Sequence, residues 1–396
     1  MPSIRFYGFD NDWEQRKLGE LALFNPKDEL PQTFEYVDLE SVVGTEMLSH
    51  RTEVKSSAPS RAQRLAHTGD LFYQTVRPYQ KNNYLFEKPD NNYIFSTGYA
   101  QMRPYVDGYF LLSLVQSERF VKVVLDNCTG TSYPAINAND LAEIEVAAPS
   151  NESEAQKIGT IFRSIDNLIT LHQRKVEKLT NVKKSMLEKM FPRNGSCYPE
   201  IRFKGFTEPW EQRKLGDVVK EITRNDPESE APIMMITANN GFIEQSERYA
   251  FNNAGESLKK YILLKKGELA YNHGASKLRP FGSCFALTTA ENARIPFVYH
   301  CFSAENQNAE FMSIELNGAE IENQLRKIVS SGARMDGLLN ISFDEYTSVS
   351  VLLPGTGEQD RIADFFRHLD NLITLHQREL EKLQSIKKAL LEKMFV

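Results

Sequence analysis

Two segments of the chain carry apolar residues mostly at alternating intervals of three and four positions. A repeat of about 3.5 residues over about four to five heptads is typical of the seam of a coiled coil. The pattern therefore predicts two long helices within residues 150–191 and 355–396, each of about 38 residues and so roughly 57 Å long at a rise of about 1.5 Å per residue. The seam positions are Ile158, Phe162, Ile165, Ile169, His172, Val176, Leu179, Lys183, Met186 and Met190, then Ile362, Phe366, Leu369, Ile373, His376, Leu380, Leu383, Lys387, Leu390 and Met394.

The two helical segments are copies of each other. About 22 of 34 positions are identical between 158–191 and 362–395, and Asp166–Arg174 repeats letter for letter at Asp370–Arg378. The identity extends beyond the seam to positions that packing alone does not fix, which indicates a partner that binds once to each copy. Gene conversion between the repeats is the alternative. The expected partner-binding residues are Asp166, Asn167, Thr170, Gln173, Arg174, Asp370, Asn371, Thr374, Gln377 and Arg378.

Matching seams favour an antiparallel pair of helices, since that arrangement relates the two halves of the chain by a pseudo-twofold axis. Residue numbers that face each other then sum to about 552, with His172 opposite Leu380 and His376 opposite Val176. The two imidazoles either fix the register of the pair or lie at the edge of the seam, bonded to neighbours.

A second, shorter repeat opens each half of the chain. The head segments at 4–20 and 201–217 share Ile-Arg-Phe and Trp-Glu-Gln-Arg-Lys-Leu-Gly, and Trp13 and Trp210 are expected to anchor them by burial of the indole. Residues 192–200, rich in Pro and Gly, form the linker between the halves.

A globular domain of little shared sequence follows each head, giving domains at 1–149 and 201–354. Aromatic and β-branched runs predict strands at 109–115, 120–125, 261–264, 297–302 and 348–353. The expected fold class is α+β, with two mixed, β-rich globules and two long helices.

Composition excludes several classes of protein. The chain of 396 residues has no apolar run that could span a bilayer and no apolar signal segment. Its four cysteines form no CxxC pair, which argues against a zinc site or a disulfide framework. We expect a cytoplasmic protein without a metal site and without membrane contact.

Catalytic signatures are also missing from the sequence. It contains no phosphate-binding G-x-x-x-x-G-K-[ST] loop, no G-x-G-x-x-G after a strand, no H-E-x-x-H and no Asn/Asp-Pro-Pro-aromatic tetrapeptide of the amino-methyltransferase kind. The sequence therefore predicts a protein that recognises and holds other molecules, and not an enzyme.

Each half carries one basic stretch although the net charge is −6. Six basic and two acidic side chains lie between His50 and Tyr84, and seven basic and two acidic ones between Lys259 and His300. Because binding responds to the local field, this pattern fits a protein that grips DNA at two places. Arg can fork onto guanine, Gln and Asn can pair with adenine, and Lys mostly neutralises phosphate. The candidate DNA-binding residues are Arg61, Arg64, Gln74, Arg77, Tyr79, Lys81 and Arg103 in the first domain, and Lys259, Asn272, His273, Lys277 and Arg279 in the second.

The repeated heads, the repeated helical motif ending in Leu-Glu-Lys-Met-Phe and the two divergent globules resemble the DNA-specificity subunit of a type I restriction–modification system. The resemblance covers the whole chain. It implies two target-recognition domains, each reading one half of a split asymmetric site on double-stranded DNA. It also implies two methyltransferase subunits on the central helices and restriction subunits that join them, so that S-adenosylmethionine, ATP and Mg²⁺ belong to those partners and no cofactor to this chain.

Two other functions remain open from the sequence. A coiled-coil adaptor whose globules bind protein would show the same helices, and it would be preferred if the chain with its partner bound no duplex. A nuclease or methyltransferase acting alone is opposed by the missing motifs.

Overall fold

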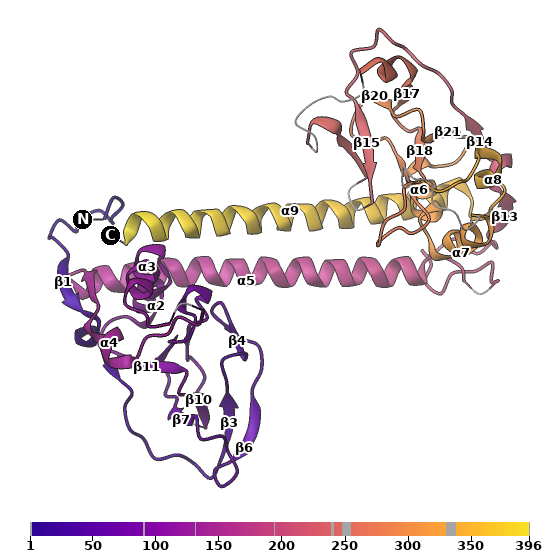
Figure 1. The fold of residues 1–396 in the computed structure, drawn as a ribbon. Helices are drawn as coiled ribbons and strands as arrows, with labels where there is room; N and C mark the ends of the chain where they lie inside the picture. The colour runs from indigo at the N-terminus through magenta and orange to yellow at the C-terminus, as the bar shows by residue number, and fades with distance from the viewer. Residues whose placement is uncertain are drawn as a thin grey trace. The chain divides into compact units, whose positions relative to one another are not determined.

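A computed structural model describes residues 2–89, 92–130, 132–193, 195–238, 241–247, 255–329 and 338–395. The chain forms two compact units, unit 1 from residues 1–175 and 376–396 and unit 2 from residues 176–375 (Figure 1). The long helices α5 (Glu152–Lys189) and α9 (Thr356–Met394) each contribute one segment to each unit. The units therefore differ from the sequence division at 149 and 201, because each contains part of both helices. Among the described residues, no helix combines the length and hydropathy that a membrane span requires.

Unit 1 contains a two-stranded sheet β1-β12, two four-stranded sheets of order β6-β3-β10-β7 and β2-β11-β8-β9, and the hairpin β4-β5. Its shorter helices are α1 (Leu18–Leu21), η1 (Pro78–Gln80), α2 (Gly108–Gln116), α3 (Glu118–Asp126) and α4 (Ala138–Glu143). Its strands are β1 (Glu14–Lys17), β2 (Ala22–Phe24), β3 (Thr33–Val37), β4 (Val42–Val43), β5 (Glu46–Met47), β6 (Arg51–Val54), β7 (Ala62–Leu65), β8 (Leu71–Gln74), β9 (Tyr84–Leu85), β10 (Tyr93–Ser96), β11 (Tyr99–Pro104) and β12 (Glu145–Ala148).

Unit 2 contains the sheets β13-β22, β14-β21-β18-β19, β15-β16 and β17-β20. Its shorter helices are η2 (Leu215–Asp217), η3 (Gln245–Glu247), η4 (Gly255–Lys260), α6 (Ala309–Leu316), α7 (Ala319–Ile328) and α8 (Phe343–Thr347). Its strands are β13 (Glu211–Lys214), β14 (Val219–Glu221), β15 (Met234–Thr237), β16 (Gly241–Glu244), β17 (Ile262–Lys265), β18 (Leu269–Asn272), β19 (Ser283–Ala286), β20 (Asn292–Ile295), β21 (His300–Ala304) and β22 (Ser350–Leu353).

The two units share a frame that their body sequences do not reveal. The sheet β2-β11-β8-β9 of unit 1 has the same strand order as β14-β21-β18-β19 of unit 2, and each is followed by two helices, α2 and α3 or α6 and α7. Apart from the matching pairs β1-β12 and β13-β22, the other sheets differ, with β6-β3-β10-β7 and the hairpin β4-β5 in unit 1 and the pairs β15-β16 and β17-β20 in unit 2. The predicted α+β class with β-rich globules is confirmed, and the divergence between the halves has a structural counterpart in these sheets.

Two predicted strands are wrong. Residues 109–115 and 120–125 form α2 and α3, although they are rich in aromatic and β-branched residues. Asp107 and Ser117 cap these helices by accepting hydrogen bonds from the backbone N–H groups of Phe110 and Phe120. Burial against the core outweighs the intrinsic preference for strand here. The predicted strands at 261–264 and 348–353 correspond to β17 and β22, and the one at 297–302 overlaps β21.

The repeated head segments make the same contacts in both units. The Glu-Gln-Arg-Lys stretch of each head is a strand, β1 or β13, which pairs antiparallel with the strand that precedes a long helix, β12 or β22. Arg5 forms a two-pronged ion pair with Glu154 at 2.8 Å, and Arg202 forms one with Glu358 at 2.7 Å. Both glutamates are buried in the first turn of a long helix, so the repeated arginines are needed to neutralise them.

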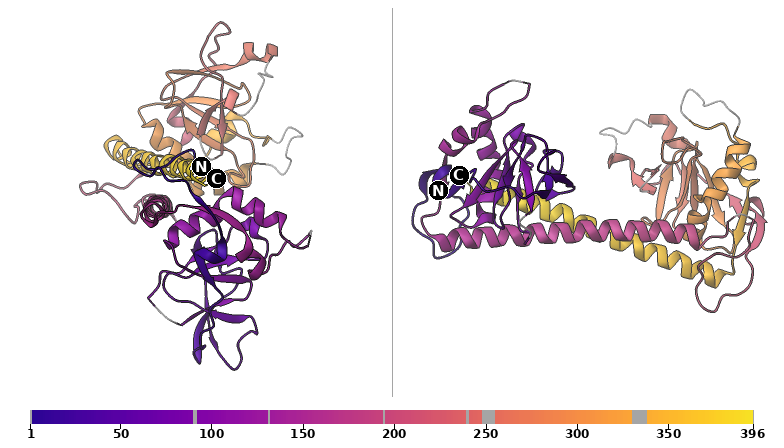
Figure 2. Two further views of the ribbon diagram at one scale, coloured as in Figure 1. Left: turned by 90° about the vertical axis from the view of Figure 1, so that its left-hand side faces the viewer. Right: turned by 90° about the horizontal axis from the view of Figure 1, so that it is seen from below.

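The Met-Phe sequence at the end of each long helix packs into the hydrophobic core of one unit. Phe395 packs against Trp13, Phe110 and Phe162 in unit 1, where the chain termini meet and Ser3 N donates to Lys393 O at 2.9 Å (Figure 2). Phe191 packs in the same way against Trp210, Phe311 and Phe366 in unit 2. The tryptophans thus anchor the heads, as predicted.

Within each unit, the segments of α5 and α9 run antiparallel, and the predicted seam positions are the least exposed along them. Asp166 pairs with Lys387 at 2.6 Å in unit 1, and the repeated residues, Asp370 and Lys183, pair at 2.5 Å in unit 2. The sums of these residue numbers are both 553, close to the predicted register. The expected meeting of each histidine with an apolar residue is corrected, because His172 and His376 lie against each other, Nδ1 to Nδ1 at 3.2 Å.

Candidate nucleic-acid interface

The loop between β8 and β9, residues 75–83, has a constrained backbone that displays side chains. Arg77 and Lys81 both adopt left-handed conformations, with φ of 54° and 56°, which cost energy for residues other than glycine. Hydrogen bonds compensate: Arg77 N donates to Pro134 O at 2.8 Å, and Gln74 N donates to the Oδ1 atom of Asn83 at 2.9 Å. We name this segment the first recognition loop.

The half-buried Arg77 and two exposed tyrosines form a basic and aromatic cluster at this loop. The Arg77 guanidinium lies 4.5 Å from the centre of the Tyr133 ring, and no ion pair is formed by Arg77 with any described acid. Tyr79 is 49% exposed and Tyr133 is 63% exposed. In such a cluster the guanidinium can donate two hydrogen bonds to the edge of a base, and the tyrosine rings can stack against a sugar or a base. These are contacts that DNA reading requires. Tyr133 was missed from the sequence, where only the neighbouring Ser-Tyr-Pro turn hinted at exposure.

Three other candidates of the first domain are already engaged. Gln74 is buried, and its Nε2 atom donates to Val76 O and to the Oε1 atom of Gln80. Lys81 forms an ion pair with Glu118 at 2.7 Å, and Arg103 forms one with the buried Asp70 at 2.9 Å. These contacts give all three residues a structural role in the loop and the sheet, and their DNA-binding role stays a prediction.

Arg61 and Arg64 lie outside this loop, at the sheet β6-β3-β10-β7. Arg61 directly precedes β7, and Arg64 is part of it. Arg61 is exposed, whereas Arg64 is half-buried, and its Nε atom has no hydrogen-bond partner among the described residues. Burial lowers the pKa of Arg64, and no carboxylate offsets that effect. An anion such as a phosphate would supply the missing partner.

The corresponding loop of unit 2, residues 273–282 between β18 and β19, is the second recognition loop. Lys277 and Leu278 are exposed in it, and no ion pair to a described acid engages Lys277. The side-chain amide of Asn272 is hydrogen-bonded within the unit: its Nδ2 atom donates to Ile236 O, and its Oδ1 atom accepts from Gly274 N. His273 is buried, with its ring nitrogens each 2.7 Å from a backbone oxygen, those of Leu339 and Val298. Lys277 is therefore the candidate of this loop that the structure leaves available at the surface.

The two Arg-Pro-aromatic sequences occupy the same loop of the frame but different places in it. Arg77 is the third residue of the first recognition loop, whereas Arg279 is the seventh of the second. Burial lowers the pKa of Arg279, which the charge of Glu322 opposes, and its Nη1 atom donates to Asn317 O at 2.8 Å. Lys259, the remaining candidate, lies in η4, outside this loop.

The repeated face of the long helices carries exposed leucines that the sequence analysis did not select. Leu168 and Leu171 of unit 1 and their copies, Leu372 and Leu375 of unit 2, are between 44% and 53% exposed. Asn167, Gln173, Arg174, Asn371, Thr374, Gln377 and Arg378 are exposed, and Thr170 donates to the Oε1 atom of Glu46 at 3.3 Å. Asp166 and Asp370 also form ion pairs between the helices, which gives their identity a structural reason, and their predicted role in partner binding stays a prediction. Apolar pairs repeated at the surface are typical of a docking face.

Comparison with known proteins gives this arrangement a context. Residues 10–181 match the family described as "Type I restriction modification DNA specificity domain". The specificity subunit of the type I restriction enzyme MjaVIII from Methanocaldococcus jannaschii is 24% identical over 308 residues, which cover 72% of this chain and 68% of that protein.

Solved structures agree on the fold. The S subunit of a type I restriction–modification system from M. genitalium has a TM-score of 0.63 at 15% identity, over 100% of this chain and 99% of that chain. A chain from a structure on complex assembly and conformational transition of the type I R-M system has a TM-score of 0.50 at 20% identity, over 98% and 99%. The predicted resemblance is confirmed.

Proposed function

We propose that this chain, whose residues 10–181 match the family of type I restriction–modification DNA specificity domains, reads a bipartite and asymmetric DNA site through its two bodies. Each body contributes one recognition loop on the same frame, and the rest of the body differs between the units. Because the two recognition loops differ in sequence while their frames are equivalent, each loop would contact a half-site of different sequence. The observation that supports this most directly is the half-buried Arg77 at a strained loop, held against Tyr133 and beside Tyr79, both of which are exposed.

The long helices would have two tasks in this function. As a continuous element shared by both units, they set the number of unread base pairs between the half-sites. Their repeated face with Leu168, Leu171, Leu372 and Leu375 would dock two methyltransferase subunits, one on each copy. Restriction subunits would join that assembly.

The chain itself would contribute no catalytic step. S-adenosylmethionine, ATP and Mg²⁺ would be bound by the partner subunits, and this chain would determine where on the duplex the partners act. We expect the assembly to work in the cytoplasm, where its DNA substrate lies.

Methylation mapping tests the proposal. DNA from cells that carry the chain and its partners should be methylated at one split motif with two unlike halves, and DNA from cells that lack only this chain should not. Methylation that is unchanged when the chain is deleted would contradict the proposal. The adaptor alternative predicts instead that the purified chain with its partner binds no duplex at moderate salt.

A further inference from the structure

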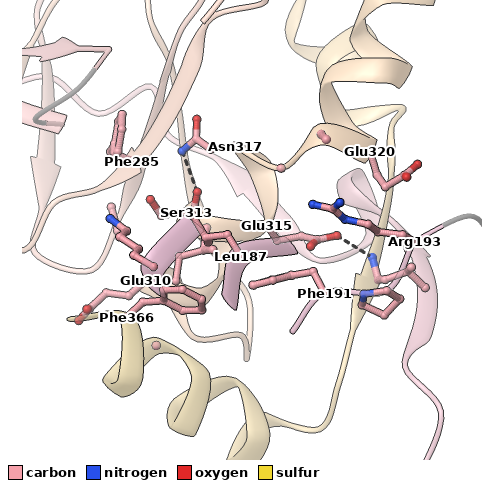
Figure 3. Close-up of a pocket in the computed structure, with 18 of the residues that line it drawn as sticks. Leu187, Phe191, Arg193, Phe285, Glu310, Ser313, Glu315, Asn317, Glu320 and Phe366 are labelled. Atoms are coloured by element: carbon pink, nitrogen blue, oxygen red, sulfur yellow. Dashed lines mark hydrogen bonds between the residues drawn. The ribbon is translucent and has the colours of Figure 1, made fainter. Parts of the chain in front are cut away.

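A cavity of about 860 Å³ lies in unit 2 between the last turns of α5, helix α6, the first turns of α7 and residues 363–371 of α9 (Figure 3). Three aromatic rings line it: Phe191 from the end of α5, Phe285 from β19 and Phe366 from α9. Edge groups of β22 at Ser350 and Leu352 form another part of the wall. The cavity is separate from the exposed tip of the second recognition loop at Lys277 and Leu278, which do not line it.

The side chain of Glu315, in α6, forms part of the wall of this cavity. Glu315 is nevertheless buried, with 8% of its surface exposed to solvent. Its Oε1 atom accepts a hydrogen bond from Leu352 N at 3.2 Å, and no cation of the described chain lies within ion-pair distance. Burial raises the pKa of Glu315 to about 7, the Leu352 hydrogen bond opposes that rise, and the nearby charge of Glu320 adds to it. A buried carboxylate with one hydrogen bond lacks the partner that such a charge normally has.

Most other charged side chains around the cavity have partners within the chain. Lys183 pairs with Asp370 and Arg367 with Glu310, while Arg279 donates to Asn317 O. Arg193 and Glu320 also line the cavity, and Figure 3 draws the Arg193 guanidinium between the carboxyl groups of Glu320 and Glu315, although no ion pair joins these residues. The carboxyl group of Glu315 is thus the buried charge of this wall that a ligand would complete.

Unit 1 shows that the shared frame does not need this carboxyl group. At the equivalent place the cavity measures only about 100 Å³, and Gln15 and Phe395 stand where unit 2 has Gln212 and Phe191. Counting from the helix caps Asp107 and Asn308, the residue that corresponds to Glu315 is the buried Leu114. Correspondingly, Arg119 of unit 1 stands at the position of Glu320. The shared frame therefore packs a buried leucine beside a small cavity in unit 1, and it has a glutamate beside a large cavity in unit 2.

We propose that the cavity of unit 2 binds a flat organic cation, a guanidinium or amidinium group on an apolar body, whose charge pairs with the Glu315 carboxylate. The aromatic rings of Phe191, Phe285 and Phe366 would hold the body of the ligand and favour its positive charge. A planar cation can also donate hydrogen bonds to the carboxylate in a fixed geometry, which a compact ammonium ion does less well. The cation is either a free small molecule or an arginine side chain of a partner protein.

Binding by such a cation is coupled to proton release. The ligand requires ionised Glu315, and the carboxyl group with a pKa of about 7 is mostly protonated at pH 6 and mostly ionised at pH 8. The affinity should therefore rise about tenfold between pH 6 and pH 8, with one proton released per ligand at the lower pH. A purely apolar pocket would show neither effect.

Isothermal titration calorimetry of the full chain with benzamidine tests the site. Benzamidine should bind with an affinity that rises with pH, and the neutral isostere benzamide should not bind. Titrations in two buffers of different ionisation enthalpy count the released proton. Glu315→Gln should weaken benzamidine binding at least tenfold at pH 8, and Glu315→Leu, which copies unit 1, should abolish it. The matched variant Leu114→Glu should create no second site, since the cavity there is too small.

The inference fails if benzamidine does not bind at millimolar concentration, or if benzamide or Glu315→Gln binds equally well. In the complex with the methyltransferase subunit, lost benzamidine binding would support an arginine side chain as the occupant, and retained binding would support a free small molecule. The site does not depend on DNA reading, so a failure here leaves the proposed function intact, and the reverse also holds.

Discussion

At the scale of single residues, partners decide which of the basic side chains are available to DNA. Arg103 and Lys81 are neutralised by Asp70 and Glu118, whereas Arg77 has an aromatic neighbour and no described acid. Sequence composition identified the basic stretch but could not identify these partners, because Asp70 and Arg103 meet only across the pairing of β8 with β11. Arg103 and Lys81 therefore have a structural role that the sequence did not reveal, beside the DNA-binding role predicted for them.

Arg77 should act as a base-reading residue in the first half-site. We expect Arg77→Ala to cost about 1–3 kcal/mol in specific binding and to relax one base position of that half-site, with the second half-site unchanged. Arg77→Lys keeps the charge but loses the planar fork, so specificity should fall more than overall affinity. Binding to a panel of singly substituted duplexes measures both. The control Lys122→Ala removes an exposed cation of α3 and should leave the base preferences intact; equal relaxation by this control would argue against the assignment.

Glu315 should make the stability of unit 2 depend on pH. Its folded pKa of about 7 lies above the ordinary value of 4.5, so the folded state holds more protons than the unfolded state between these values. Stability is therefore lost as the pH rises from about 4.5 to 7, by up to roughly 3 kcal/mol. Glu315→Gln should remove this loss, so that its advantage over the natural chain grows from pH 5 to pH 8 in denaturant titrations. An advantage that does not change with pH would contradict the assignment.

At the scale of elements, periodicity was a better guide than composition. The long helices follow from a seam that repeats over their whole length, and each seam position is buried or half-buried in the structure. The short helices α2 and α3 were predicted as strands because nine residues give too few turns to show a period, and their caps are single residues. The seam predicted the register to within one residue of the Asp–Lys pairs, but it did not predict that His172 meets His376.

The exposed leucine pairs of the helices should each hold one methyltransferase subunit. We expect Leu168→Ser with Leu171→Ser to release one subunit from the complex, Leu372→Ser with Leu375→Ser to release the other, and all four changes to release both. Each pair exchanges apolar docking surface for hydroxyl groups that gain little from burial. Native mass spectrometry of the complex counts the subunits. Ile386→Ser, a change at another exposed apolar residue of α9, should retain both subunits; loss of a subunit from this control would show that any apolar loss on the helix suffices.

At the scale of the whole molecule, the internal repeat was the most informative feature of the sequence. It identified the heads, the helices and the divergent bodies, and the structure explains the heads through the Arg5–Glu154 and Arg202–Glu358 ion pairs. The common frame of the bodies was not visible in the sequence, because a strand order such as β2-β11-β8-β9 is compatible with many apolar residues at each buried position. The cavity beside Glu315 likewise depends on the packing of α6, α7 and β22, which have no shared sequence signal.

The length of the helices should set the spacing of the DNA site. We expect removal of one heptad from both α5 and α9, at facing positions, to shorten the helical pair by about 10 Å and the unread spacer by about three base pairs. Both half-sites should stay the same, because neither recognition loop is altered. Methylation mapping with the shortened chain measures the spacer; a change in the half-site bases at constant spacing would contradict the spacer role.

The claim that two unlike bodies read one split site is tested most directly by selection from randomised duplex DNA. The chain in complex with its methyltransferase subunit is incubated with the pool, and the retained duplexes are sequenced. We predict one enriched motif with two unlike halves at a fixed separation, and with Arg77→Ala a loss of preference confined to one half. Enrichment of a single continuous motif, or of no sequence at all, would contradict the claim.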